Sequence, residues 1–446
     1  MSNGARNSVP PGKLGLPYLG ESLAVLHNPF DFLDVRRARH GDVFKSRLLG
    51  RTTVFLAGIE GAEAFYDDRN ISRADAHAFP IVDLFGGVNM EMYDGPRHHA
   101  LKSMALTAFD RGSLAGYLPG LQGLIEHRLA GWAEAGEFSA TAELRKLAIE
   151  AICLNLLGFE PGPRTDAICR DYATVLKGFV SPPLALPATP YGRARQARDR
   201  LLTTIGATIV EHRRHPSDDG LSRLLAARAD DGRAYTDDEA VLEVHHIVIA
   251  GFVVYALMAE VLRQLAEQPE LARRCASEIR DHAKTGPVTL EALRRLQLAT
   301  RVVLETKRFV PLVPLAFGRA QRSFTCAGLR VREGWRVYLS LHLCNTDPRL
   351  FRQPARFDPD RFGPERAEGD QHRLAFIPQG AAPPIGHQCL GLEYSTVLTL
   401  LFLTLVVRGY EWQVPAQDFT MRWNTLPPEP HDGLRVSLRT RSGGVA

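Results

Sequence analysis

A long helical stretch from Asp237 to Glu267 constrains the fold of this chain more than any other part of its sequence. Its apolar residues recur with the period of an α-helix for roughly eight turns, and its centre is apolar on every side. A helix without a polar face is stable only when it is buried in the core of a large protein. We therefore expect a fold built around this helix, and a chain of 446 residues is long enough to enclose it.

The rest of the pattern is mainly helical. Asn28 and Pro29 mark the start of a helix that runs towards Arg39, and residues 97–109, 114–134, 141–157 and 191–214 have helical periodicity. Residues 42–58 and 328–340 alternate between apolar and polar side chains around turns, which predicts two β-hairpins. The expected fold class is mainly α, of the α+β kind, with a long central helix and small antiparallel β-sheets near both ends of the chain.

Nothing in the sequence divides the chain into several domains. The proline-rich stretch 181–190 is too short for an interdomain linker, and no internal repeat is visible. We predict a flexible N-terminal tail at residues 1–12 and one large domain over residues 13–446. The N-terminus has no apolar core, and the apolar run 396–407 falls short of the roughly 20 residues that a membrane span needs.

Charge and cysteine usage narrow the possible partners. A formal net charge of +4, spread along the chain, does not indicate a nucleic-acid-binding or membrane-surface protein, so the expected partner is a small molecule. The six cysteines are far apart and include no CxxC pair, which argues against disulfides and zinc knuckles. We expect a soluble, cytoplasmic monomer that binds neither nucleic acid nor membrane.

Cys389 is the cysteine with the most informative surroundings. It ends a glycine- and proline-rich loop in Gly-His-Gln-Cys-Leu-Gly and directly precedes a long apolar helix. Unpaired N–H groups and the dipole at a helix N-terminus stabilise a thiolate, which suits a metal ligand or a nucleophile. The alternative is a small buried hydrophobic residue in a turn.

An ion pair is expected further upstream. Glu305 and Arg308 are spaced to share one helix face, and such pairs are usually solvated surface bridges. Here apolar residues flank the pair on both sides, so we predict that it is buried and shared with Arg361 in the segment FDPDRF.

In this order, the Glu-x-x-Arg helix, the Phe-x-Pro-x-Arg-Phe segment and the Cys-x-Gly motif at Cys389 resemble those of the cytochrome P-450 family of haem-thiolate oxygenases. The resemblance runs from about Pro10 to the C-terminus. It implies that the cofactor is haem b and that Cys389 is the axial ligand of its iron. It also implies that His98, Lys102, Arg319 and His387 hold the haem propionates, with Gly391 in the ligand motif.

The cysteine loop departs from the usual family pattern. Phe376 lies thirteen residues before Cys389, whereas the family spacing is Phe-x-x-Gly-x-x-x-Cys. A similar expanded loop occurs in the bacterial fatty-acid peroxygenase branch, which the chain also resembles in softer features. That branch holds a substrate carboxylate with a helix arginine, and this chain has no Arg or Lys between Arg233 and Arg263.

The central helix departs from the family pattern as well. Most members carry Ala-Gly-x-acid-Thr over the haem, where the acid and the hydroxyl deliver protons to dioxygen. This chain has Ala250 and Gly251 followed, after one residue, by Val253 and Val254, and neither valine can donate a proton. His246 lies on the same helical face and could act instead, although a lone buried histidine more often bonds to a local partner.

The expected function is therefore oxidation of a small hydrophobic or aromatic molecule with atypical oxygen activation, in which Ala250, Gly251, Val253 and Val254 line the pocket. The oxidant is either hydrogen peroxide or dioxygen with a ferredoxin-type electron donor. Two alternatives stay open: a non-redox isomerase or dehydratase of the same family, and a non-catalytic haem-binding protein.

Overall fold

The structure is a computed structural model, and it describes residues 8–310, 312–381, 386–423 and 425–441. The chain forms two compact units. Unit 1 contains residues up to His99 together with 313–356 and 364–389, and unit 2 contains 100–312, 357–363 and the residues from Leu390 onward. The single domain expected over residues 13–446 stays a prediction.

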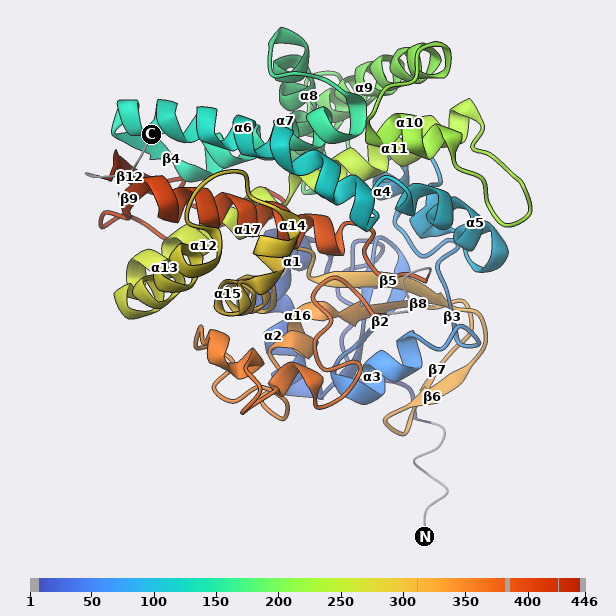
Figure 1. The fold of residues 1–446 in the computed structure, drawn as a ribbon. Coiled ribbons are helices and arrows are strands. Elements are labelled where there is room, and N and C mark those ends of the chain that lie inside the picture. Colours follow the sequence, from blue (N-terminus) through green and yellow to red (C-terminus); the bar gives the residue numbers. More distant parts are fainter. Residues whose placement is uncertain (1–7, 311, 382–385, 424, 442–446) are drawn as a thin grey trace. The chain divides into compact units, whose positions relative to one another are not determined.

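Unit 1 is built around a five-stranded sheet of order β1-β2-β8-β5-β3, in which strands from both halves of the chain lie side by side (Figure 1). Its strands are β1 (Val43–Leu48), β2 (Arg51–Leu56), β3 (Ile71–Ser72), β5 (Leu315–Ala320) and β8 (Arg336–Ser340), with a separate hairpin of β6 (Phe324–Cys326) and β7 (Leu329–Val331). Its helices are α1 (Ser22–His27), α2 (Pro29–His40), α3 (Gly58–Phe65), α4 (Phe79–Leu84), α16 (Leu341–Asn345) and the short 3-10 turns η2 (Met90–Met92) and η4 (Glu368–Asp370).

Both faces of this sheet are covered by apolar side chains. Val54 and Leu56 on β2 belong to one buried cluster, and Phe55 between them belongs to another. Successive residues of a strand point to opposite faces, so the apolar run of β2 serves both clusters. Phe55 stacks on Phe44 of β1 with ring centroids 5.0 Å apart.

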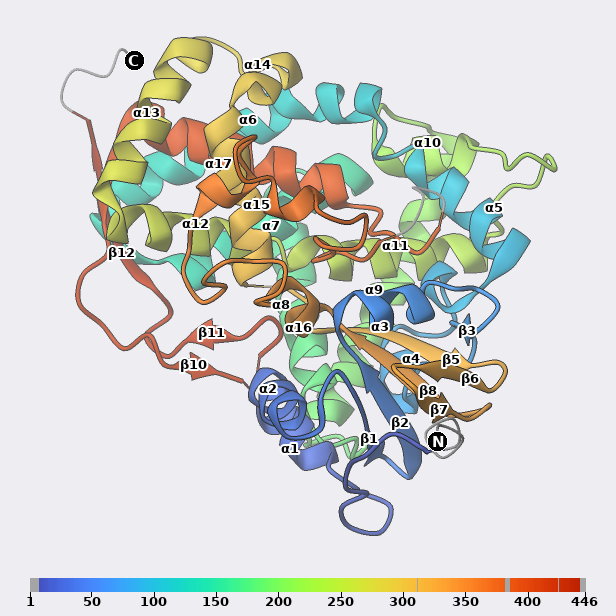
Figure 2. The ribbon, with the colours of Figure 1, turned by 90° about the horizontal axis from the view of Figure 1, so that it is seen from below.

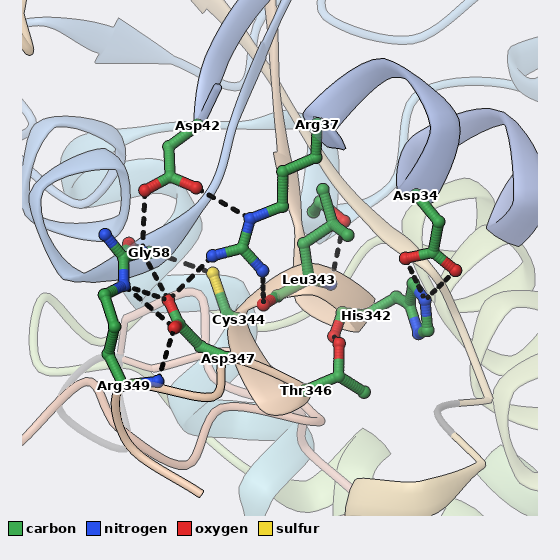
Figure 3. A network of polar contacts seen from close by, with 11 residues as sticks. Asp34, Arg37, Asp42, Gly58, His342, Leu343, Cys344, Thr346, Asp347 and Arg349 are labelled. Atoms are coloured by element: carbon green, nitrogen blue, oxygen red, sulfur yellow. Dashed lines mark hydrogen bonds and ion pairs between the residues drawn. The ribbon is translucent and has the colours of Figure 1, made fainter. Parts of the chain in front are cut away.

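An ion network joins α2, Asp42 directly before β1, and the segment after α16 (Figure 3). Asp347 accepts hydrogen bonds from Arg37 at 3.0 Å and from the Nε of Arg349 at 2.9 Å. Asp42 accepts from the same two arginines at 2.7 and 2.6 Å. Two carboxylates and two guanidinium groups thus neutralise one another beside a cavity of about 250 Å³.

Unit 2 contains most of the described helical residues. Its helices are α6 (Arg111–Ala135), α7 (Ala140–Leu157), α8 (Pro163–Phe179), α9 (Pro190–Arg214), α10 (Gly220–Ala226), α11 (Asp237–Phe252), α12 (Tyr255–Glu267), α13 (Pro269–Ala283), α14 (Leu290–Arg295), α15 (Gln297–Phe309), the 3-10 turn η3 (Pro359–Phe362) and α17 (Leu392–Gly409). Its strands are β4 (Glu137–Ser139), β9 (Tyr410–Gln413), β10 (Met421–Arg422), β11 (Glu429–Pro430) and β12 (Arg435–Thr440). Strand β12 lies between β4 and β9 in one sheet. Strands β10 and β11 form a separate hairpin (Figure 2). The helix α5 (Gly95–Leu106) begins in unit 1 and ends in unit 2.

Most of the predicted elements are confirmed. Asn28 caps α2 by accepting hydrogen bonds from the N–H groups of Phe30 and Asp31. The helices expected at 114–134, 141–157 and 191–214 are α6, α7 and α9. The first expected hairpin is the β1–β2 pair, whose turn residues Leu49 and Gly50 both have positive φ.

One predicted helix is locally interrupted, and one predicted hairpin is wrong. The helix expected over Asp237–Glu267 is present as α11 and α12, with an interruption at Val253 and Val254, where the N–H of Val254 bonds to Gly251 O at 3.3 Å. Hydrophobic periodicity continues through the break, so it gave no sign of it. The second hairpin, expected at 328–340, does not form, because β7 pairs with β6 while β8 pairs with β5 and, in parallel, with β2.

The predicted N-terminal tail is described only in part. Residues 1–7 of the expected tail lie outside the described residues, whereas Ser8 and Pro11 accept backbone hydrogen bonds from Arg330 and Lys45.

Two helical stretches of the described residues are strongly apolar. Asp237–Glu267 and Leu392–Gly409 are apolar and long enough to cross a membrane by composition alone, but 67% and 72% of their most apolar windows are buried in the structure. Burial of this extent is typical of core helices.

Candidate functional site

The predicted ion cluster in unit 2 is confirmed. Glu305, Arg308 and Arg361 are completely buried. Arg308 donates two hydrogen bonds to the Glu305 carboxylate at 2.7 and 2.8 Å, and Arg361 Nε donates to the same carboxylate at 3.0 and 3.1 Å. The N–H of Asp358 adds a further bond at 2.9 Å. One carboxylate therefore fixes the end of α15 to the segment that contains η3.

The loop before Cys389 folds back on itself in unit 1. The N–H of Cys389 donates to Gln379 O at 3.0 Å, and the Gln379 side-chain amide donates to Cys389 Sγ at 3.5 Å. Gly380 has φ of +80°, and a Cβ there would lie 3.0 Å from His387 O, so the close approach requires glycine. The N–H of Ala381 donates to the Tyr66 hydroxyl at 2.9 Å. Residues 382–385 of the expanded loop lie outside the described residues.

The sulfur of Cys389 differs in its surroundings from most other thiols of the chain. Cys389 is only half-buried, whereas Cys153, Cys275, Cys326 and Cys344 are buried. Burial raises the pKa of the Cys275, Cys326 and Cys344 thiols to about 12 and that of Cys153 further still. These four thiols are therefore protonated, while Cys389 combines accessibility with an amide donor at its sulfur. This donor chemistry fits a thiolate ligand for a haem iron.

His387, two residues before Cys389, stacks on His98 of α5. The ring centroids are 3.9 Å apart and the rings are inclined by 25°. The Nδ1 of His98 contacts Met90 O at 2.7 Å. The structure thus brings together two of the residues that the sequence assigned to the cofactor, and it does so with planar groups that can hydrogen bond to an acidic ligand.

Asp94 is the group that organises this part of unit 1, and sequence reasoning did not single it out. Its carboxylate accepts hydrogen bonds from Ser72 Oγ at 2.6 Å and from the N–H of Arg73 at 2.9 Å. It also lies 3.7 Å from His387 Nε2. Burial would raise the pKa of Asp94, but hydrogen bonds from His387, Ser72 and the backbone hold it well below its usual range. Asp94 is therefore an anion that favours a cationic His387.

The pKa values of the two stacked histidines are shifted in opposite directions. Burial alone would lower the pKa of His387, but the carboxylates of Asp94 and Glu91 raise it above its usual value. Burial and the neighbouring charge of His387 lower the pKa of His98. Of the two rings, His387 therefore holds a proton more strongly than His98.

The other residues assigned to the cofactor lie as follows. Arg319 is on β5 opposite Ser72 of β3, and its Nε donates to Ala74 O at 3.3 Å, so it lies in the same neighbourhood as Asp94. Lys102 belongs to unit 2 and is completely buried on α5. Gly391 caps α17, and no described atom lies within 4 Å of the position that a Cβ would take there.

The predicted pocket residues lie at the end of α11. Ala250 is exposed, although Val248, Ile249 and Phe252 around it are buried. Gly251 packs on α7, and a Cβ there would lie 3.0 Å from the Ile152 side chain. Val253 and Val254 form the break between α11 and α12. An exposed apolar surface at this point of a buried helix is suited to contact a hydrophobic molecule.

His246 and its neighbour His245 have different partners. His246 Nδ1 lies 3.6 Å from an oxygen of Glu243, one turn earlier on α11. His245 is completely buried, and its Nδ1 lies 3.2 Å from the hydroxyl of Tyr172 on α8. Sequence reasoning named His246 but not Glu243, whose spacing of three residues was a signal that could have been used.

Three comparisons relate the chain to known proteins. A family model described as cytochrome P-450 matches residues 10–432. The abscisic acid 8'-hydroxylase 4 of Arabidopsis thaliana is 26% identical over 453 residues, which covers 98% of this chain and 94% of the plant protein. The solved structure of retinoic acid bound cyanobacterial CYP120A1 is 26% identical with a TM-score of 0.90, covering 97% of this chain and 99% of that chain.

A further solved structure, cytochrome P-450 EX alpha (CYP152N1) with myristic acid, is 22% identical with a TM-score of 0.78, covering 97% and 99% of the two chains. At this identity the likeness concerns the fold alone. Together with the described helices and small sheets, these matches confirm the expected fold class.

Proposed function

Because the chain belongs to the cytochrome P-450 family, it is an oxidoreductase, and we propose that it oxidises a small hydrophobic molecule, by hydroxylation or a related reaction, with Cys389 as the ligand of its haem iron. Members of this family bind haem b through a cysteine thiolate. The single observation that supports Cys389 as this ligand is its half-buried sulfur, which accepts a hydrogen bond from the Gln379 amide in a loop folded around the cysteine.

The residues proposed to hold the haem fit an acidic porphyrin. Asp94 and Glu91 raise the pKa of His387, which favours its protonated form, and His98, Lys102 and Arg319 are further donors for propionate oxygens. When bound, the haem supplies a redox-active iron whose thiolate ligand donates the electron density that favours O–O cleavage. The Gln379 amide tempers this donation because it hydrogen bonds to the same sulfur.

For the oxidant we propose hydrogen peroxide. The family's usual acid and hydroxyl are replaced by Val253 and Val254, which occupy the break between α11 and α12 and carry no proton-donating group. Peroxide carries its own protons and both oxidising equivalents, so it needs neither this pair nor an electron-donor protein. Dioxygen with a ferredoxin-type donor is the competing route, and it depends on proton delivery.

The substrate is proposed to be an apolar or aromatic molecule. Ala250 is exposed and Val253 partly exposed at the end of α11, and both would offer it apolar contacts, whereas Val254 is buried and Gly251 packs on α7. The names of similar proteins refer to abscisic acid, retinoic acid and myristic acid, each of which carries one carboxylate. No Arg or Lys lies between Arg233 and Arg263, so a carboxylate on the substrate would need a partner outside α11.

We further propose that the enzyme acts as a monomer in the cytoplasm. Burial of its two most apolar helices supports this, since helices that line a core do not need a membrane. The small net charge of +4 is in keeping with a small-molecule enzyme that binds neither nucleic acid nor lipid.

A non-redox reaction is the second candidate. The valine pair favours it as well, because an isomerase or dehydratase that acts on an already oxidised substrate needs no proton delivery to dioxygen. A non-catalytic haem-binding role is the third, and it predicts no turnover under any condition.

The test compares oxidants on one panel of apolar, aromatic and fatty-acid substrates. We expect product with hydrogen peroxide alone and little product with a ferredoxin system. Efficient ferredoxin-driven turnover without any peroxide activity would refute the choice of oxidant. Conversion of a hydroperoxide substrate with no added oxidant would identify the isomerase alternative.

Restoring the usual pair provides a matched variant. The double substitution Val253→Asp with Val254→Thr supplies an acid and a hydroxyl at the break, so ferredoxin-driven turnover is expected to rise relative to wild type. Val253→Asn with Val254→Ser, which places polar groups of similar size there without the acid, is the control. An equal effect of both variants would show that polarity, and not proton delivery, limits the reaction.

A further inference from the structure

Arg73, directly after β3 in unit 1, is a buried cation without an ion pair. Its side chain is only 7% exposed, and its Nη1 donates a hydrogen bond to Phe317 O at 3.1 Å. Among the described residues, this carbonyl is the one acceptor of a side-chain hydrogen bond from Arg73, and no carboxylate lies within ion-pair distance of the guanidinium. A guanidinium has several N–H donors, so most of its hydrogen-bonding capacity is directed elsewhere.

The fold holds this guanidinium in one position. Its central carbon lies 4.2 Å from the ring centroid of Phe65 and 6.0 Å from that of Tyr66, both on or directly after α3. Gly318 of β5 makes room for it, because a Cβ there would lie 3.1 Å from Arg73 Nη1. The Tyr66 hydroxyl in turn accepts a hydrogen bond from the N–H of Ala381 in the cysteine loop. Rings and a carbonyl therefore position the charge of Arg73 but do not neutralise it.

The acidic residues near Arg73 compensate its charge only in part. Burial lowers the pKa of Arg73, and the negative charges around it, which include Glu91 and Asp94, oppose this effect without cancelling it. Asp94 accepts a hydrogen bond from the backbone N–H of Arg73, at 2.9 Å. A buried cation is costly unless an anion compensates its charge at close range. An anionic ligand beside the guanidinium would supply this compensation.

The neighbours of Arg73 indicate which anion this is. Ser72, the preceding residue, lies opposite Arg319 in the β3–β5 pair. Asp94, which binds the N–H of Arg73, lies 3.7 Å from His387 Nε2. Arg319 and His387 are proposed above to hold the haem propionates, and all of these residues belong to unit 1 together with Cys389. A propionate carboxylate is therefore the anionic group expected beside Arg73.

We propose that Arg73 is a further haem-binding residue, whose guanidinium donates hydrogen bonds to a propionate carboxylate of the haem. This inference rests on the proposed function, because it takes the haem to be bound at Cys389. The bond is charge-assisted, which is the stronger kind of hydrogen bond. Phe65 and Phe317 already fix the side chain, so little of its conformational freedom is lost when the haem binds.

The first test measures how fast the haem leaves the holoenzyme, by its transfer to an excess of apomyoglobin. Arg73→Gln is expected to raise the dissociation rate about 10- to 100-fold, the effect of losing one hydrogen bond to a charged group. Arg73→Lys keeps the charge but not the planar fork, so its rate is expected to lie between those of wild type and Arg73→Gln. Arg69→Gln is the control, since Arg69 is 79% exposed and paired with Asp67. An unchanged rate in Arg73→Gln would overturn the proposal.

The second test separates a propionate contact from a general effect on the structure of unit 1. Wild type and Arg73→Gln are each reconstituted with haem dimethyl ester, in which both carboxylates are uncharged. The ratio of their dissociation rates is expected to be about tenfold smaller than with haem b, because only a neutral hydrogen bond is left to lose. An equal ratio with both cofactors would overturn the proposal, since a merely structural role of Arg73 would not depend on the propionate charge.

The new inference and the proposed ligand fail in different ways. If the reduced wild-type protein lacks a thiolate-type carbon monoxide spectrum but Arg73→Gln accelerates the loss of haem b and not of its ester, the assignment of Cys389 is wrong and that of Arg73 stands. If the thiolate-type spectrum is present and Arg73→Gln releases haem as slowly as wild type, Cys389 stands and Arg73 is wrong. Circular dichroism verifies the fold of each variant. If Arg73→Gln does not fold, Arg73→Lys takes its place, and an equal change with both cofactors overturns the proposal.

Discussion

Removing the charge of Glu305 is expected to destabilise unit 2 more than any other single change in its buried ion cluster. The cluster contains one carboxylate and two guanidinium groups, all completely buried. Glu305→Gln removes the charge of the carboxylate to which both Arg308 and Arg361 hydrogen bond. Breaking a buried ion pair in this way typically costs about 3–5 kcal/mol. We expect a cost of about 4 kcal/mol in the free energy of unfolding.

The matched variants remove one arginine instead. Arg361→Met or Arg308→Met removes one guanidinium, and Glu305 keeps its hydrogen bonds to the other. The expected cost of each is about 2 kcal/mol, which covers the lost hydrogen bonds and the unfilled volume. The ordering, and not only the size, follows because Glu305 bonds to both arginines, whereas each arginine variant keeps the other arginine's bonds to Glu305.

The assay is urea unfolding of the haem-loaded protein, followed by circular dichroism at a helix-sensitive wavelength. Wild type, Glu305→Gln, Arg308→Met and Arg361→Met are compared at one temperature and pH. A cost below about 1 kcal/mol for Glu305→Gln, or a larger cost for either arginine variant, would refute the argument from uncompensated buried charge.

Two further predictions concern the other parts of the structure. Asp347 accepts hydrogen bonds from Arg37 and Arg349. Burial would raise the pKa of Asp347, but the hydrogen bonds from Arg349 lower it below its usual value. The stability that Asp347 contributes is therefore present above about pH 4 and is lost as the pH falls further. Asp347→Asn should therefore reduce the thermal stability of the protein at neutral pH and flatten its decline below pH 4; an unchanged acid limb of the melting curve would contradict this. Gly251→Ala should destabilise the packing of α11 on α7 by about 1–3 kcal/mol, because the new methyl group would lie 3.0 Å from Ile152. Combined with Ile152→Ala it should cost less than the sum of the two single changes in urea unfolding, and strict additivity would show that the contact is not the cause.

The sequence predicted the elements that depend on neighbouring residues, and it failed for those that depend on contacts between distant segments. The β1–β2 hairpin was predictable because Leu49 and Gly50 supply a local turn between alternating strands. The expected hairpin at 328–340 failed because the partners of β8 are β2 and β5, and a strand pattern does not name its partner. The interruption at Val253 and Val254 was not predicted, because the apolar periodicity of the sequence continues across it.

Some features of the candidate site were predictable from the sequence, and others were not. The buried cluster of Glu305, Arg308 and Arg361 was predictable, because charges embedded in apolar sequence must find partners. The stacking of His387 on His98 was not, since it joins residues almost three hundred positions apart. Asp94 begins the segment DGPRHHALK, but its role was not predictable, because its hydrogen bonds come from Ser72 and the backbone of Arg73, about twenty residues earlier in the chain.

The assignment of Cys389 as the haem ligand is tested most directly by the carbon monoxide difference spectrum of the reduced protein. Wild type is expected to show the Soret band typical of a thiolate-ligated haem, and Cys389→Ala, with folding verified by circular dichroism, is expected to lose it. Cys169→Ala, which removes the other cysteine that is not fully buried, should leave the band unchanged. A thiolate-type band that persists in Cys389→Ala would contradict the account.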